Sequence, residues 1–211
     1  VYFAVSKGIT SSNDGSHYAL TRTLVENGTF ELRQFDDYAE GNDIALVRDV
    51  LYSDRPPGSA LLASLFYRAG SWFPDPLTPI PSKHDADNDR LLTVMLLPVW
   101  AGALTAVLLY LLLRGLFQFG QGVALTAVLF YAFGTIHFKY STVLFSHALS
   151  GLLVVACVGL LLWLWKQPHW RGYGILGALL GFSVLVEYSN GLLVGLVSLV
   201  VLWQWWGWRK Q

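Results

Sequence analysis

Long runs of apolar residues dominate the second half of the chain. The first run, 91–113, holds 23 residues without a charged side chain. Two further runs, 121–138 and 142–165, follow after short turns that carry Arg114 and Lys139. A helix needs about 20 apolar residues to cross a hydrocarbon core about 30 Å thick. The pattern therefore predicts three membrane-spanning helices in these ranges.

The last apolar stretch, 172–206, is too long for one straight span. Its 35 residues would form a helix about 52 Å long. Its main polar cluster is Glu187-Tyr188-Ser189-Asn190, so we expect the chain to break there into segments 172–187 and 191–206. A carboxylate that faces lipid is costly, so Glu187 should face protein or water. Together, the runs predict about five transmembrane helices.

The polar residues 7–90, which we call the head, precede the apolar runs. Two amphipathic surface helices are expected in the head, at about 14–28 and 57–73. Polar capping residues precede the first helix, and Pro56-Pro57 stiffens the entry to the second. The acidic segment between them, 29–50, is expected to form a solvated loop or a short hairpin. The chain as a whole is predicted to be an all-α integral membrane protein.

The composition agrees with a membrane protein. Hydrophobic residues make up 54% of the chain and charged residues 13%, about half the charged share of a soluble domain. A soluble domain of this size cannot bury so much apolar surface, so that class is excluded. The single cysteine excludes a disulfide-rich scaffold. No basic tract is interleaved with aromatic residues, so nucleic acid is not an expected partner.

The charges are unevenly distributed along the chain. Residues 1–90 carry 13 acidic and 8 basic side chains, whereas the remaining residues carry 1 acidic and 6 basic ones. Five of these six basic residues fall on one predicted side of the membrane: Arg114, Lys166, Arg171, Arg209 and Lys210. Because basic loops favour the cytoplasmic side, the head and Lys139 are predicted outside. We expect an integral protein of a bacterial inner or plasma membrane, with residues 7–90 external.

On this topology, several polar side chains share the outer face and are expected to line one cavity. They are Asp14, Asp54, Arg55, His137, Lys139, His147 and Glu187. Taken singly, each has an ordinary structural interpretation: Asp14 as a helix cap, and Asp54 with Arg55 as a surface ion pair. His147 is predicted five residues inside the third span, about 7 Å below its boundary. Their shared face indicates a functional site.

Two motifs in the head and their order along the chain suggest a family. The first motif is Asn13-Asp14-Gly15-Ser16-His17-Tyr18, and the second is Tyr52-Ser53-Asp54-Arg55-Pro56-Pro57-Gly58. The turn at 133–148 and the span at 177–188 follow in the same order. The chain resembles the amino-terminal part of glycosyltransferases of the C-type membrane fold. It is most similar to the protein mannosyltransferase-like and aminoarabinose transferase-like families, in which two jaw helices lie in a first external loop.

The resemblance implies transfer of a sugar from a polyprenyl-phosphate donor to an acceptor at the outer membrane face. Asp14 matches the position of the family's catalytic acid, so it is the expected base for the acceptor. Arg55 is the expected ligand of the donor phosphate, because its planar fork suits phosphate. Lys139 and His137 are second choices for that role. His147 stands where related sequences often carry an acidic residue.

The expected partners are membrane lipid and the polyprenyl-phosphate sugar donor. No cofactor is assigned, and a divalent metal ion is considered without a defined set of ligands. Since such enzymes usually continue for hundreds of residues, we expect the chain to be the amino-terminal part of a longer enzyme. The alternative is a non-catalytic accessory subunit of a larger membrane complex. A transporter is disfavoured because the sequence has few spans and no internal repeat.

Overall fold

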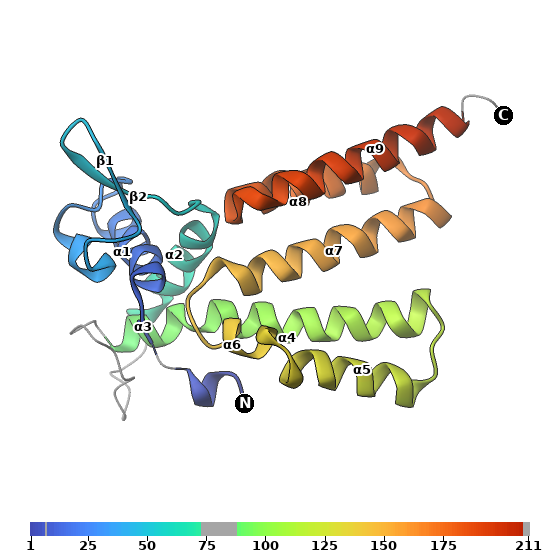
Figure 1. Ribbon diagram of the computed structural model, residues 1–211, viewed down its shortest axis with the longest axis horizontal. Coiled ribbons are helices and arrows are strands. Elements are labelled where there is room, and N and C mark those ends of the chain that lie inside the picture. Colours follow the sequence, from blue (N-terminus) through green and yellow to red (C-terminus); the bar gives the residue numbers. More distant parts are fainter. Residues whose placement is uncertain (7, 73–87, 209–211) are drawn as a thin grey trace.

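The computed structural model describes residues 1–6, 8–72 and 88–208. Figure 1 shows two parts that lie end to end: the head, and a bundle of apolar helices formed by residues 91–208. Most of the described residues are helical, and one small antiparallel sheet lies in the head. The short N-terminal turn η1, Phe3–Val5, lies beside the bundle near the head.

Helix α1, Ser12–Glu26, is the centre of the head. Every residue from Asp14 to Thr21 is buried, so this part of the helix is enclosed on all sides. This differs from a surface helix with one buried face. The short helix η2, Arg33–Ala39, packs against α1 so closely that the backbone of Tyr38 lies directly over Gly15. Helix α2 and the sheet cover the other faces of α1.

The head also contains a β-hairpin, which corrects the all-α prediction. Strands β1, Ile44–Val47, and β2, Val50–Ser53, pair antiparallel. Arg48 and Asp49 form the turn, and both have positive φ, as the two-residue turns that match strand twist require. Of the two forms expected for the segment between the head helices, a solvated loop or a short hairpin, the structure shows the hairpin, which extends to Ser53. The fold is mostly helical with this one small sheet.

Helix α2, Gly58–Gly70, packs on α1 and forms much of the head core. Its buried side chains Ala60, Ala63 and Tyr67 recur at helical spacing. The exposed side chain of Leu65 lies on the opposite face. The predicted range of this helix, 57–73, ends outside the described residues.

Gly58 sets the distance between the head and the bundle. A Cβ atom at this position would lie 2.6 Å from the Leu185 carbonyl carbon and 2.7 Å from the Val186 nitrogen. Only glycine allows this approach, so the first turn of α2 rests against the last turn of α8. The start of α2 therefore lies close to the chain break that begins at Glu187.

The first long helix of the bundle runs from Arg90 to Leu116. It is made of α3, Asn88–Val94, α4, Leu96–Leu111, and the π-helical turn η3, Leu112–Leu116. Its head-side end carries Leu91, Val94 and Met95 into the core of the head. The membrane helix and the head therefore share one apolar core.

Two shorter helices follow this long helix. Helix α5, Gln121–Gly134, ends four residues before the predicted boundary at 138, because Thr135 has an extended backbone. Helix α6, Ile136–Tyr140, then forms a separate turn. With 14 residues, α5 is about 21 Å long, which is less than the thickness of a bilayer core.

Helix α7, Ser146–Lys166, begins four residues later than the predicted start of the third span at 142. The chain reaches it through a turn that ends at Phe145, whose backbone is extended. His147 therefore lies in the first turn of α7 and not one and a half turns inside the helix. This corrected position brings its side chain to the head-side end of the bundle.

The final apolar stretch breaks at Glu187, as its length predicts. Helix α8, Trp170–Val186, ends where Glu187 adopts an extended backbone with φ −152° and ψ 117°. The short turn η4, Tyr188–Asn190, and helix α9, Gly191–Trp208, follow. Asn190 holds the break together, because its side-chain amide donates to the Ser183 carbonyl at 3.0 Å.

Three helices in the described part of the chain are long and apolar enough to cross a membrane. They are Arg90–Leu116, Ser146–Lys166 and Tyr188–Gly207. Helices α5 and α8 are apolar but shorter. The protein is therefore an integral membrane protein by the length and composition of these helices, and the total of about five spans stays a prediction.

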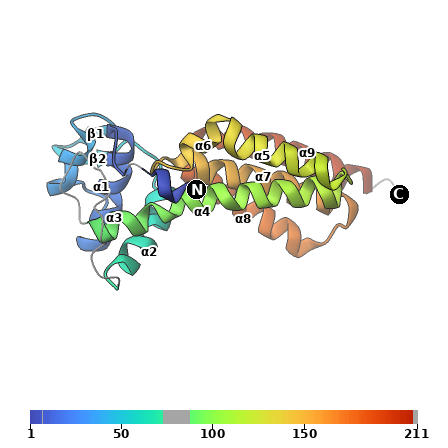
Figure 2. The same ribbon diagram turned by 90° about the horizontal axis from the view of Figure 1, so that it is seen from below.

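The two ends of the bundle differ in charge and in neighbours. Figures 1 and 2 show the head at one end, beside α6 and the start of α7. The end of the first long helix, the end of α7 and the start of α8 lie at the opposite end of the bundle, and they carry Arg114, Lys166 and Arg171. These basic residues thus share one end of the bundle, as the charge pattern predicts.

Candidate functional site

A pocket of about 580 Å³ opens at the head-side end of the bundle. It is lined by Tyr131, Thr135, Ile136, His137, Tyr140, His147, Ser150, Gly151, Val154, Val155, Glu187 and Ser189. These residues come from α5, α6, α7 and the break between α8 and α9. The pocket brings together three residues that the sequence analysis assigned to one cavity, His137, His147 and Glu187.

Glu187 and His147 form a close pair in this pocket. The Nδ1 atom of His147 lies 3.3 Å from Oε2 of Glu187. The Ser146 hydroxyl donates to the same carboxylate oxygen. The His147 side chain is 42% exposed and that of Glu187 is 25% exposed, so both are open to a small molecule in the pocket.

His137 lines the same pocket but is already fully engaged. Its Nε2 atom lies 3.2 Å from the Gly102 carbonyl oxygen, which can only accept. The Nε2 atom must therefore carry the hydrogen, and Nδ1 accepts from the Tyr131 hydroxyl at 3.1 Å. His137 ties α6 to α4 and α5, so it would have to give up one of these bonds to bind a phosphate. Lys139 is exposed and lies outside the pocket lining.

Arg55 lies in the head and pairs with two carboxylates. Its guanidinium contacts Asp43, and its Nε atom lies 3.1 Å from Oδ1 of Asp54. Asp43 also accepts a hydrogen bond from the Ser12 hydroxyl, which fixes it against the start of α1. The sequence analysis expected Arg55 to pair with Asp54. It did not identify Asp43 as a second carboxylate partner.

Asp14 completes a capping box at the start of α1, in which Ser11 is the N-cap residue and Asp14 is the third residue of the helix. Its carboxylate is fully buried and accepts four hydrogen bonds. Oδ2 receives the backbone N–H and the hydroxyl of Thr10, at 2.8 and 3.1 Å. Oδ1 receives the backbone N–H and the hydroxyl of Ser11, both at 2.7 Å. Asp14 is not among the residues that line the head-side pocket. All four of its hydrogen bonds stabilise the start of α1.

His17 is a functional candidate that sequence reasoning missed. It is buried, and neither ring nitrogen has a hydrogen-bond partner among the described residues. Burial is the largest cause, followed by electrostatic interactions with Arg55 and His147, and together they lower the pKa of its imidazole to about 3. A neutral imidazole without a hydrogen-bond partner among the described residues thus lies buried in α1, within electrostatic range of Arg55 and His147. His17 lies three residues after Asp14, so the two side chains share one face of a helix. This spacing was the signal in the sequence that could have identified His17.

The low pKa of His17 predicts that acid destabilises the head. Between pH about 6.5, the ordinary value for histidine, and about 3, the unfolded chain binds a proton that the folded chain excludes. The free energy of unfolding should therefore fall as the pH falls through this window, by at most about 1.4 kcal/mol per pH unit. Thermal unfolding of the purified protein between pH 7.5 and 5 measures this slope.

Two variants isolate the contribution of His17 to that slope. His17→Gln removes the titrating group and should flatten the pH dependence of the unfolding midpoint. His169→Gln is the matched control, because His169 is exposed and packs edge-on against Trp163 far from the head. An equal slope in the wild type and in His17→Gln would contradict the prediction.

The described residues contain no group of three or more His, Cys, Asp and Glu side chains that is arranged to hold a metal ion. The divalent metal considered from the resemblance therefore gains no ligand set in the part of the chain that the structure describes.

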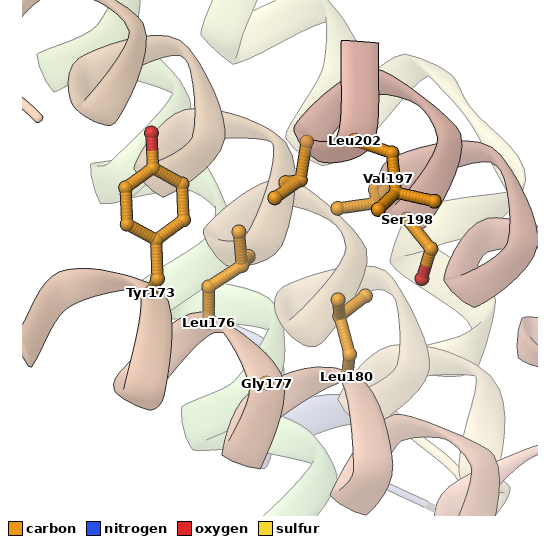
Figure 3. Close-up of a pocket in the computed structure, with 8 residues that line it drawn as sticks. Tyr173, Leu176, Gly177, Leu180, Val197, Ser198 and Leu202 are labelled. Atoms are coloured by element: carbon orange, nitrogen blue, oxygen red, sulfur yellow. The ribbon is translucent and has the colours of Figure 1, made fainter. Parts of the chain in front are cut away.

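A second pocket, of about 330 Å³, lies between α8 and α9 (Figure 3). Leu176, Leu180, Val197 and Leu202 make most of its wall. The Tyr173 hydroxyl donates to Gln204 at 2.9 Å, so its strongest polar group is occupied. This second pocket is lined mainly by apolar side chains, whereas His137, His147 and Glu187 line the head-side pocket. The head-side pocket is therefore the candidate functional site.

Comparison with known proteins identifies the family. The model of the dolichyl-phosphate-mannose-protein mannosyltransferase family matches residues 87–211, more than half of the chain. The chain belongs to this family. Comparison with curated proteins and with solved structures finds no match. The range that matches the mannosyltransferase family includes the whole lining of the head-side pocket, with His147 and Glu187.

The family match thus supports the resemblance to membrane glycosyltransferases that the sequence motifs suggest. Asp14, His17 and Arg55 lie before residue 87, outside the matched range. Their roles therefore rest on their own geometry and on the motifs of the head.

Proposed function

We propose that the protein moves a sugar from a polyprenyl-phosphate donor to an acceptor at the outer membrane face. The observation that carries this proposal is the match to the mannosyltransferase family over the helices that form the head-side pocket. That pocket combines an apolar wall with titratable groups, which suits a donor with a lipid tail and a polar sugar. The expected acceptor is a hydroxyl or an amine.

The orientation of the donor follows from the chemistry of the pocket. Val154 and Val155 form a wall toward the bundle, where a prenyl chain would lie against apolar side chains. His147 and Glu187 lie at the head-side end, where the sugar and the acceptor would meet. In this arrangement Arg55 binds the departing phosphate. Its guanidinium leaves the exposed Asp54 carboxylate and donates hydrogen bonds to the phosphate oxygens instead.

The outer location of the site is part of the proposal. The head and the pocket lie at the end of the bundle opposite Arg114, Lys166 and Arg171. Short loops rich in lysine and arginine favour the cytoplasmic side. This distribution supports a reaction on the external face of the membrane.

Transfer by the purified protein tests the function. The protein in lipid nanodiscs receives radiolabelled dolichyl-phosphate mannose and a peptide with serine and threonine hydroxyls. Label on the peptide is the expected result. Arg55→Ala should raise the donor concentration needed for half-maximal transfer about 10- to 100-fold, since a charged hydrogen bond contributes about 1.5–3 kcal/mol. Saturating donor should restore most of the rate.

Arg33→Ala is the matched control, because Arg33 is exposed and pairs with Glu31 away from the pocket. It should leave the donor dependence unchanged. An absence of transfer with both polyprenyl-phosphate mannose and polyprenyl-phosphate aminoarabinose would overturn the proposal. Co-purification in a fixed ratio with a larger membrane complex would then favour the accessory-subunit alternative.

A further inference from the structure

We propose that Glu187, together with His147 and Tyr140, binds the hydroxyl groups of the donor's sugar and sets the preference for a sugar-bearing lipid. This inference rests on the proposed function and adds which side chains recognise the sugar. The ligand class is a sugar with neighbouring free hydroxyls, attached to a polyprenyl phosphate. All three residues line the head-side pocket.

One carboxylate oxygen of Glu187 is engaged by the protein, and the other is not. Oε2 accepts a hydrogen bond from the Ser146 hydroxyl and lies 3.3 Å from Nδ1 of His147. Oε1 has no hydrogen-bond partner among the described residues, and the side chain is 25% exposed. A carboxylate at a break in an apolar segment is costly unless its oxygens are satisfied. Oε1 is therefore available to accept from a ligand hydroxyl.

Two further polar groups lie next to this carboxylate in the pocket. The Nε2 atom of His147 and the Tyr140 hydroxyl have no hydrogen-bond partner in the part of the chain that the structure describes. The Tyr140 ring packs edge-on against the imidazole with centroids 4.5 Å apart. The Phe145 ring contacts the same imidazole at a centroid distance of 5.9 Å. This packing holds a carboxylate, an imidazole and a phenol together as one binding surface.

Most other polar side chains of the pocket are already engaged within the protein. The Tyr131 hydroxyl bonds to His137 at 3.1 Å. The Thr135 hydroxyl donates to the Tyr131 carbonyl at 2.7 Å. The Asn190 amide donates to the Ser150 hydroxyl at 2.9 Å. Hydroxyl groups of a ligand would therefore find their hydrogen bonds at Glu187 and its two neighbours.

The sugar is the part of the donor that fits these groups. Its hydroxyls can each donate a hydrogen bond, and a carboxylate is a pure acceptor. A negatively charged phosphate beside Glu187 would be repelled by like charge, which agrees with a phosphate site at Arg55. The pocket volume of about 580 Å³ lies within the range of about 300–1,000 Å³ for small-molecule sites.

Binding of two lipids that differ in the sugar tests the inference. The purified protein in lipid nanodiscs is titrated with dolichyl-phosphate mannose and with sugar-free dolichyl phosphate, in the absence of acceptor. The wild type should prefer the mannose-bearing lipid by about 10-fold or more. Glu187→Ala should bind this lipid about 10- to 100-fold more weakly, because a hydrogen bond to a charged group is lost. Its affinity for dolichyl phosphate should stay near the wild-type value.

Tyr140→Phe provides a milder second variant, because it removes one hydroxyl and keeps the ring that packs on His147. It should weaken binding of the mannose-bearing lipid about 2- to 10-fold, the contribution of a neutral hydrogen bond. Arg55→Ala should weaken both lipids by a similar factor, since both carry the phosphate. Glu31→Gln is the matched control, because Glu31 pairs with Arg33 away from the pocket, and it should bind both lipids as the wild type does.

The outcomes separate this inference from the proposed function. A wild type that binds neither lipid and transfers no sugar would overturn the proposed function itself. A wild type that transfers mannose but shows no preference for the mannose-bearing lipid would overturn only the sugar site. An equal loss of both lipids in Glu187→Ala and in Tyr140→Phe would also overturn it. Weaker binding of the peptide acceptor with unchanged lipid affinities would assign these residues to the acceptor and would contradict the proposal.

Discussion

Asp14→Asn should lower the free energy of unfolding by about 2–4 kcal/mol, although the two side chains have nearly the same shape. Both carboxylate oxygens of Asp14 accept two hydrogen bonds each, from Thr10 and Ser11. An amide nitrogen cannot accept, so two buried donors lose their partner. Hydrogen bonds to a charged group contribute about 1.5–3 kcal/mol. Thermal unfolding monitored by circular dichroism measures the loss.

Asp37→Asn provides the control for this variant. Asp37 lies in η2 and is exposed, so its replacement should change the unfolding midpoint very little. An equal midpoint in Asp14→Asn and the wild type would contradict the cap geometry.

The same variant separates the two roles considered for Asp14. If Asp14 only stabilises the start of α1, the transfer rate per folded Asp14→Asn molecule should stay near the wild-type rate. The resemblance to membrane glycosyltransferases implies the opposite, an inactive but folded protein. Loss of transfer at a temperature where the variant is fully folded would therefore support Asp14 as the base.

Gly15→Ala should destabilise the head, although alanine normally favours a helix by about 1 kcal/mol over glycine. An added Cβ would overlap the Tyr38 carbonyl oxygen and lie 2.7 Å from the Tyr38 carbonyl carbon. Because this contact is with backbone, a side-chain rotation cannot relieve it, and η2 must move away from α1. We expect a loss of at least about 1–3 kcal/mol, as for other overpacked sites.

Gly181→Ala is the matched control for the glycine variant. Gly181 also lies inside a helix, α8, but an added Cβ would meet no atom within 4 Å. Its unfolding midpoint should stay at or above the wild-type value. An increase in stability in Gly15→Ala would show that η2 does not press on α1 as described.

The sequence by itself determined the ranges of the apolar helices to within four residues, and where the last apolar stretch breaks. The length of 172–206 against the bilayer thickness required a break, and the polar residues from Glu187 to Asn190 located it. The order of capping residues located α1 and placed Asp14 at its start. These features depend on local composition and chain length, which can be read along the chain.

Only the tertiary structure decided which polar groups meet. The His147–Glu187 contact joins residues 40 positions apart, and the Arg55–Asp43 pair joins the two segments that flank the hairpin. The full burial of His17 depends on packing around α1 from several directions. Such contacts follow from how the helices are placed in space, and sequence spacing alone does not fix that placement. The position of His147 illustrates the reason: because α7 begins four residues later than expected, His147 lies in its first turn and lines the head-side pocket.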